Sequence, residues 1–150
     1  LPFCYPLGWL GYFPALALWL CLTGALYVFA GTRWLRETPT GIPLFVLLAA
    51  FPPVLITITH GQTSFLVAGL LGLGAYLVRR SPYIAGALFG LATIKPQFGL
   101  LIPIVLLLTG EWRVIAAAVT TALALALLAT ALFGLETWTA WSAQISRPAS

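Results

Sequence analysis

Charged residues are scarce in this sequence. Of its 150 residues, 7% are charged and 61% are hydrophobic, whereas an ordinary soluble domain carries about 25% charged residues. Seven basic and three acidic side chains are too few to keep the surface of a 150-residue globule dissolved. The composition therefore excludes a soluble enzyme and a disordered tail, and it predicts an integral membrane protein.

Other residue types are missing altogether. The chain has no Asp, Asn or Met, and because it begins at Leu1 we expect it to be a piece of a longer protein. Cys4 and Cys21 are too few for a disulfide framework. No cluster of His, Cys, Asp and Glu has metal-ligand spacing, so we expect no metal site. The net charge of +4 is scattered between apolar segments, which argues against a nucleic-acid partner.

Long apolar runs make up most of the chain. A helix that crosses a bilayer core of about 30 Å needs about 20 apolar residues. The sequence predicts an all-α, polytopic transmembrane helical bundle, a single domain over residues 1–150 with six membrane segments. The predicted segments are residues 12–30, 41–59, 62–78, 83–94, 97–109 and 114–133. Pro52 and Pro53 must kink or interrupt the second of them.

The stretch 83–109 contains Lys95-Pro96 and forms either one kinked helix or two short arms. Cytoplasmic loops are enriched in Lys and Arg, so the charge distribution can discriminate between these arrangements. Two arms keep five of the seven basic residues on one side, namely Arg33, Arg36, Arg79, Arg80 and Arg113. We therefore predict a broken helix pair at Lys95-Pro96, with the arginines in the cytoplasm and both chain ends outside it.

Lys95 is the strongest candidate for a binding residue. Arms of 12–13 residues reach only about 18–20 Å, so their tip lies below the outer membrane surface, where irregular backbone needs a cavity or protein cover. A lysine at that depth predicts a site for a phosphate or another anion, with Gln97 two residues later. Alternatively, Lys95 snorkels and carries its ammonium group to the interface.

A second candidate lies between the second and third predicted segments. His60 and Gln62 are expected at the same outer face as Lys95, where the N-terminus of the following helix favours an anion. His60 can donate to a phosphate or move a proton, although a purely structural role fits it equally. We expect Thr63 and Ser64 to be helix caps.

Several glycines recur at helical spacing. Gly86 and Gly90 form a small-xxx-small pair, which predicts a close approach between two helices. Gly69, Gly72 and Gly74 are expected to do the same on the preceding segment. A phosphate-binding loop is the alternative, but no Lys-Ser/Thr pair follows these glycines.

Several short motifs occur in a specific order. They are Phe3-Cys4-Tyr5-Pro6, the run Gly61-Gln62-Thr63-Ser64-Phe65-Leu66, Arg79-Arg80, residues 85–113 and residues 133–138. Together they resemble glycosyltransferase family 87, multi-span GT-C-type enzymes related to polyprenol-phosphate-mannose-dependent mannosyltransferases. The resemblance covers residues 1–142.

The resemblance implies a hexosyltransferase of the bacterial inner membrane, a multi-pass protein whose active face is extracytoplasmic. It implies transfer of a mannose-like hexose from a polyprenyl-phosphate donor, a membrane lipid, to a glycan or glycolipid acceptor, without a cofactor in this chain. The family's Gly-Gln and Lys-Pro-Gln motifs fall on Gly61-Gln62 and Lys95-Pro96-Gln97. Lys95, Gln62, His60 and Gln97 are therefore the expected substrate-binding residues.

Two departures from the family pattern stand out. The family usually has Asn just after the Gln of its Gly-Gln motif, where this chain has Thr63 and Ser64. Its catalytic carboxylate is an Asp in an earlier loop, and because this chain has no Asp, the catalytic residue stays unknown and the chain alone is expected to be inactive. The alternative function is a transporter or flippase that binds an anionic substrate at Lys95.

Overall fold

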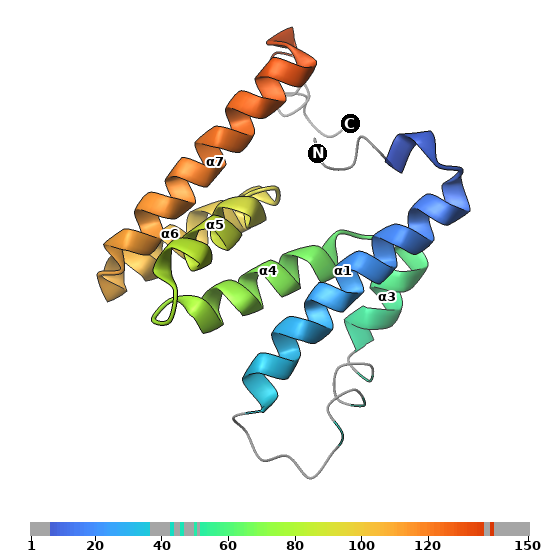
Figure 1. The fold of residues 1–150 in the computed structure, drawn as a ribbon, viewed down its shortest axis with the longest axis horizontal. Coiled ribbons are helices and arrows are strands. Elements are labelled where there is room, and N and C mark those ends of the chain that lie inside the picture. Colours follow the sequence, from blue (N-terminus) through green and yellow to red (C-terminus); the bar gives the residue numbers. More distant parts are fainter. Residues whose placement is uncertain are drawn as a thin grey trace, which may run out of the picture.

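The computed structural model describes residues 7–36 and 52–136, together with residues 43, 46, 50 and 139. Regular structure in these residues is entirely helical (Figure 1). The helices are α1 (Tyr12–Leu35), α3 (Pro52–His60), α4 (Ser64–Leu77), α5 (Pro82–Ala92), α6 (Pro96–Thr109) and α7 (Trp112–Phe133). The predicted all-α fold is confirmed.

The predicted break at Lys95-Pro96 is present. Helix α5 ends at Ala92, and α6 begins at Pro96, so the two-arm prediction is confirmed over the single kinked helix. Lys95 has extended backbone angles (φ −102°, ψ 107°), because a residue that precedes proline is excluded from the helical region by the proline ring. Pro96 itself is well suited to the first helical position, where no N–H is needed.

The proline pair also marks a helix start. Helix α3 is nine residues long and begins at Pro52, so Pro52 and Pro53 occupy its first turn rather than its interior. Most of the predicted segment before Pro52 lies outside the described residues. Within the described part, the second predicted segment is therefore a short helix that ends at His60.

Two pairs of the described helices run in parallel. Along α1 and α4, Trp34 Nε1 donates to the Gly72 carbonyl at 2.7 Å, and Gly69 lies against Leu26, eight residues before Trp34. The contacts thus advance in the same sense along both helices, which makes α1 and α4 parallel. By the same reasoning α5 and α7 are parallel, since Gly86 faces Ala117 and Gly90 faces Thr121. In Figure 1, α4 lies between α1 and α5.

The glycines allow the helix backbones to come close together. A Cβ atom at Gly86 would lie 2.9 Å from the backbone nitrogen of Ala118, and one at Gly90 would lie 2.6 Å from the Ala118 carbonyl oxygen. A Cβ atom at Gly69 would lie 2.7 Å from Leu26 of α1. The packing prediction is confirmed at Gly69, Gly86 and Gly90, because no larger residue fits at these contacts. It is not confirmed at Gly72, where a Cβ atom would meet only Ala30, at an ordinary distance of 3.5 Å.

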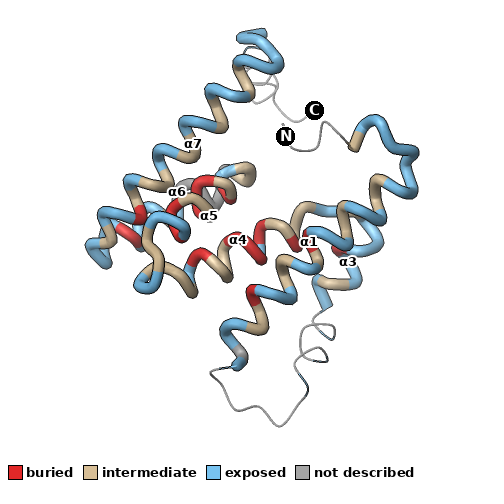
Figure 2. The backbone as a smooth tube through the Cα atoms, in the orientation of Figure 1, coloured by how far each residue is buried: buried red, intermediate tan, exposed pale blue. Residues whose placement is uncertain are grey.

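Exposed residues occur along most of the length of α1 and α7, the two longest helices (Figure 2). Helices α1 and α7 are long and apolar enough to cross a membrane, yet only 11% and 6% of their most apolar segments are buried. Leu127 of α7, for example, is 72% exposed. A core helix of a soluble protein would bury such residues, so these surfaces suit contact with lipid.

Polar side chains within these long helices are satisfied locally. Thr23 is buried and donates to the carbonyl of Trp19 at 2.7 Å, one turn earlier. Thr120 and Thr121 of α7 make the same contact at 2.8 and 2.9 Å. Such back-bonding pairs these threonine hydroxyls in a medium without water.

Candidate functional site

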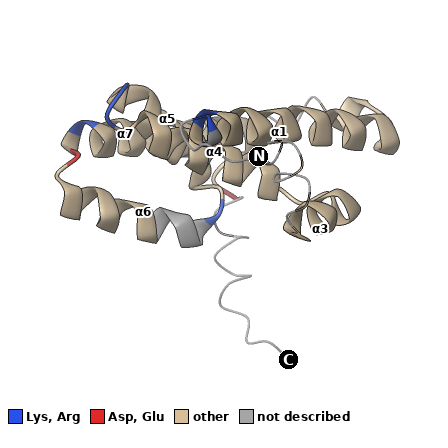
Figure 3. Cartoon of the chain, turned by 90° about the horizontal axis from the view of Figure 1, so that it is seen from below, with Lys and Arg blue, Asp and Glu red and all other residues tan. Residues whose placement is uncertain are grey.

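The basic residues lie at helix ends and in the turns between helices, and most of each helix carries no charge (Figure 3). Arg33 lies in the last turn of α1, and the ring of Trp34 contacts that of Tyr76 near the end of α4, with centroids 6.0 Å apart. Arg79 and Arg80 follow α4 directly. Arg36 and Arg113 lie at the same end, as the directions of their helices show. Arg36 directly follows α1, and Arg113 lies in the first turn of α7. We call this the arginine end.

Lys95 lies at the opposite end, between α5 and α6. Its side chain is half-buried, and its backbone N–H donates to the Ala92 carbonyl at 3.2 Å. The hydroxyl of Thr93 donates to the Gly90 carbonyl at 2.6 Å. These bonds hold the three-residue connection in one shape. Gln97 belongs to the first turn of α6, but its side chain lies outside the described residues.

His60 ends α3 with its ring folded back along the helix. Its Nδ1 atom lies 3.1 Å from the Ile56 carbonyl and 2.9 Å from the hydroxyl oxygen of Thr59. The Ile56 carbonyl can only accept, so a hydrogen bond to it requires the proton on Nδ1. In that tautomer Nε2 carries the proton only when the ring is charged. The exposed Nε2 accepts a hydrogen bond in the neutral ring and donates one in the charged ring.

Gly61 and Gln62 form the turn between α3 and α4. Gly61 has φ +60°, and the N–H of Gln62 donates to the Thr57 carbonyl at 3.3 Å, as at many helix ends that close with a left-handed glycine. The exposed Gln62 accepts a bond from Ser64 at its Oε1 atom, at 3.2 Å. Its NH₂ group has no hydrogen-bond partner in the described part of the chain and is available to donate.

The expected capping by Thr63 and Ser64 is wrong. Thr63 stands at the N-cap position of α4 but makes no side-chain cap hydrogen bond, and Ser64 donates to Gln62 instead of accepting a backbone N–H. The reason is that the Gly61 turn already sets the chain direction, while the Ser64 hydroxyl is used to orient Gln62. Ser64 therefore positions a predicted binding residue, a role that sequence reasoning missed.

The two candidate turns lie at the same end, opposite the arginines. Because α1 and α4 run in parallel, as do α5 and α7, the turn after α3 and the turn after α5 both face away from the arginine end. No hydrogen bond joins His60 or Gln62 to Lys95 within the described residues. Nor does that part of the chain contain a group of three His, Cys, Asp or Glu residues suited to a metal ion.

Helix lengths determine how deep Lys95 lies. Gly90 of α5 faces Thr121 of α7, so Ala92, the last residue of α5, is level with about residue 123. Helix α7 continues for ten residues beyond that level to Phe133, which corresponds to about 15 Å. Figure 1 shows α7 extending well past the end of α5. If α7 crosses the bilayer, Lys95 lies well inside its outer surface.

Long, exposed apolar helices, with arginines at one end and a lysine at a helix break at the other, are the features of a helical membrane protein. The sequence model of glycosyltransferase family 87 matches residues 1–150. The chain therefore belongs to glycosyltransferase family 87, which makes it a membrane glycosyltransferase. This confirms the resemblance seen in the sequence motifs. No curated protein and no solved structure matches the chain.

Proposed function

We propose that the enzyme transfers a mannose-like hexose from a polyprenyl-phosphate donor to a glycan or glycolipid acceptor outside the cytoplasm, in the bacterial inner membrane. Family membership supports glycosyl transfer. The observation that supports a phosphate-linked donor is Lys95, a half-buried cation at the helix break opposite the arginine end. The five arginines support a cytoplasmic location for their own end and hence an extracytoplasmic one for Lys95.

The proposed role of Lys95 follows from the charge that the reaction releases. When the bond between the sugar's anomeric carbon and the phosphate oxygen breaks, the bonding electrons leave with the lipid phosphate. An ammonium group close to that oxygen stabilises the developing charge, and it does so most strongly where water is excluded. Pro96 has no N–H to offer, so the positive charge at the start of α6 comes chiefly from Lys95.

The other binding residues supply directional contacts. Gln62, oriented by Ser64, donates its NH₂ group to a phosphate or sugar oxygen. His60 presents Nε2, which donates to the phosphate when the ring is charged. Gln97 completes this set by its match to the family motif. The family's catalytic Asp has no counterpart in this chain, which contains no Asp, so we assign no general base among these residues.

The test is a set of substitutions in the intact enzyme in its native membrane. We expect Lys95→Gln to lower transfer from a polyprenyl-phosphate mannose by about a hundredfold or more, the usual cost of removing one charge-stabilising group. Lys95→Arg keeps the charge and should retain part of the activity. Arg113→Gln removes an equal charge at the arginine end and serves as the matched control. Wild-type transfer by Lys95→Gln, at equal protein levels, would refute the proposal.

A further inference from the structure

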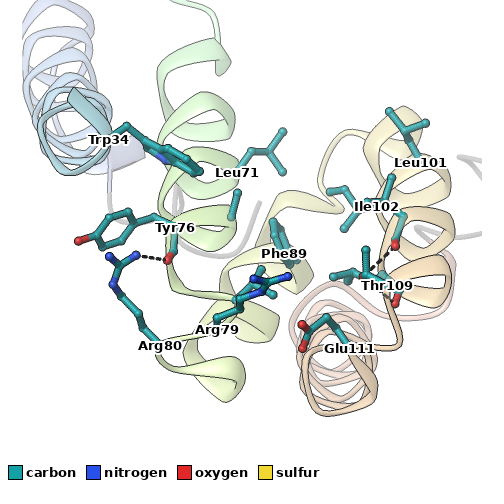
Figure 4. Close-up of a pocket in the computed structure, with 14 residues that line it drawn as sticks. Trp34, Leu71, Tyr76, Arg79, Arg80, Phe89, Leu101, Ile102, Thr109 and Glu111 are labelled. Atoms are coloured by element: carbon teal, nitrogen blue, oxygen red, sulfur yellow. Dashed lines mark hydrogen bonds between the residues drawn. The ribbon is translucent and has the colours of Figure 1, made fainter. Parts of the chain in front are cut away.

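A recess lies at the arginine end, away from the proposed donor site. It has a volume of about 590 Å³ and is lined mainly by residues of α4, α6 and the α4–α5 turn (Figure 4). Trp34 of α1, Phe89 of α5 and Glu111 of the α6–α7 turn complete the lining. Helices α4 and α6 form its two sides, while Phe89 of α5 lies at its base. Cavities of this size with mostly apolar walls are typical of small-molecule sites.

The walls of this cavity are apolar along most of its depth. Leu71 and Ala75 come from α4, and Leu101 and Val105 come from α6. Leu101 is 60% exposed and Val105 is 52% exposed, so the cavity opens along α6 to the surroundings of the helices. In a membrane protein those surroundings are acyl chains, which are chemically matched to such walls.

The mouth of the cavity carries two cations and one anion. Arg80 is fixed to the end of α4, because its guanidinium lies 4.0 Å from the Tyr76 ring centroid and donates to the Tyr76 carbonyl at 3.2 Å. Arg79 is exposed, and its side chain extends beside Phe89 into the cavity (Figure 4). Arg79 has no hydrogen bond or ion pair among the described residues. Glu111, on the far side of the mouth, leaves the mouth with a net positive charge.

We propose that this cavity binds one anionic phospholipid, with an acyl chain between α4 and α6 and the phosphate at Arg79. Charge selects the occupant, because a planar guanidinium without a protein partner pairs with a phosphate through two parallel hydrogen bonds. Basic recesses between helices at the cytoplasmic face are suited to anionic lipid headgroups. A zwitterionic lipid would add its own cation beside two arginines, which disfavours it.

The experiment uses the intact enzyme in nanodiscs of phosphatidylcholine that contain a minor fraction of phosphatidylglycerol. The measured quantity is the phosphatidylglycerol retained per enzyme after exchange, counted by native mass spectrometry. We expect Arg79→Gln and the cavity-filling Ala75→Trp each to lower retention about tenfold. Arg36→Gln, which removes the same charge at the same end but does not line the cavity, should leave retention unchanged.

A photoactivatable acyl chain on the phosphatidylglycerol supplies a second measurement. Its crosslinks should map to residues 101–109 of α6 and disappear in Ala75→Trp, whose folding is checked by its thermal unfolding. If Arg36→Gln and Arg79→Gln lowered the retained phosphatidylglycerol equally, the lipid would be held by diffuse charge attraction, and the proposed site would be overturned. An absence of crosslinks on α6 would mean that another part of the enzyme covers the cavity, which also overturns it. None of these results depends on Lys95.

Discussion

Substituting Gly86 by Ala should disrupt the contact between α5 and α7. The added Cβ atom would approach the carbonyl oxygen of Val114, lie 2.5 Å from the Cβ of Ala117 and lie 2.9 Å from the backbone nitrogen of Ala118. Two of these three neighbours are backbone atoms of α7, so they cannot move aside as a side-chain tip does. The helices must separate instead, and overpacking of this kind costs about 1–3 kcal/mol.

Gly72→Ala is the matched control for this substitution. It lies in the middle of α4, and a Cβ atom there would meet only Ala30, at an ordinary contact distance of 3.5 Å. Both substitutions gain the same intrinsic helix propensity, about 0.5–1 kcal/mol, so the difference between the two variants isolates the steric term. We expect Gly86→Ala to be less stable than Gly72→Ala by about 1–3 kcal/mol.

The assay is reversible unfolding of the intact enzyme in mixed micelles, followed as the fraction of denaturing detergent is raised. Membrane helices persist in such unfolded states, so the titration reports the packing between helices rather than helix formation. Equal free energies of unfolding for Gly86→Ala and Gly72→Ala would refute the argument, because they would show that α5 and α7 do not pack through Gly86.

Two further predictions concern the arginine end and its orientation. Trp34→Phe keeps the ring against Tyr76 but loses the hydrogen bond to Gly72. It should therefore lower the free energy of unfolding by about 0.5–1.5 kcal/mol. Trp112 is exposed, so Trp112→Phe should change the free energy of unfolding little in the same titration. In a background free of other cysteines, a membrane-impermeant maleimide should label His60→Cys from outside intact cells and Arg113→Cys only after lysis. Labelling of both residues from outside would contradict the proposed orientation.

The sequence was sufficient to predict most of the helices, because their limits are set by local chemistry. Pro96 fixes the start of α6 and the extended backbone of Lys95, so the break between the two arms was predictable. The packing role of Gly86 and Gly90 was also predictable. Two glycines four residues apart leave a helix face without side chains, and a second helix fills that face only when its backbone comes close. Their partner helix, α7, was not predictable from that spacing.

What the sequence did not predict depends on contacts between distant segments. The cavity at the arginine end exists because α6 and α4 pack on opposite sides of Phe89, and no pattern within either helix encodes that separation. The error at Ser64 has a similar origin. A serine near a helix start usually accepts a hydrogen bond from a backbone N–H. Here the Gly61 turn places Gln62 close enough for the Ser64 hydroxyl to donate a hydrogen bond to it instead.

Depth is the strongest structural argument about Lys95. A lysine near a helix end normally extends its stem and carries the ammonium group to the interface. The register between Gly90 and Thr121 leaves about ten residues of α7, or about 15 Å, between the end of α5 and Phe133. Residues 93–95 form a turn that regains about 6 Å of this distance, and the four-carbon stem of Lys95 is shorter than the remainder. Snorkelling is therefore disfavoured if α7 crosses the bilayer. The charge of Lys95 then requires a counter-ion or water within the membrane, and a lipid phosphate is an anion that the membrane itself supplies.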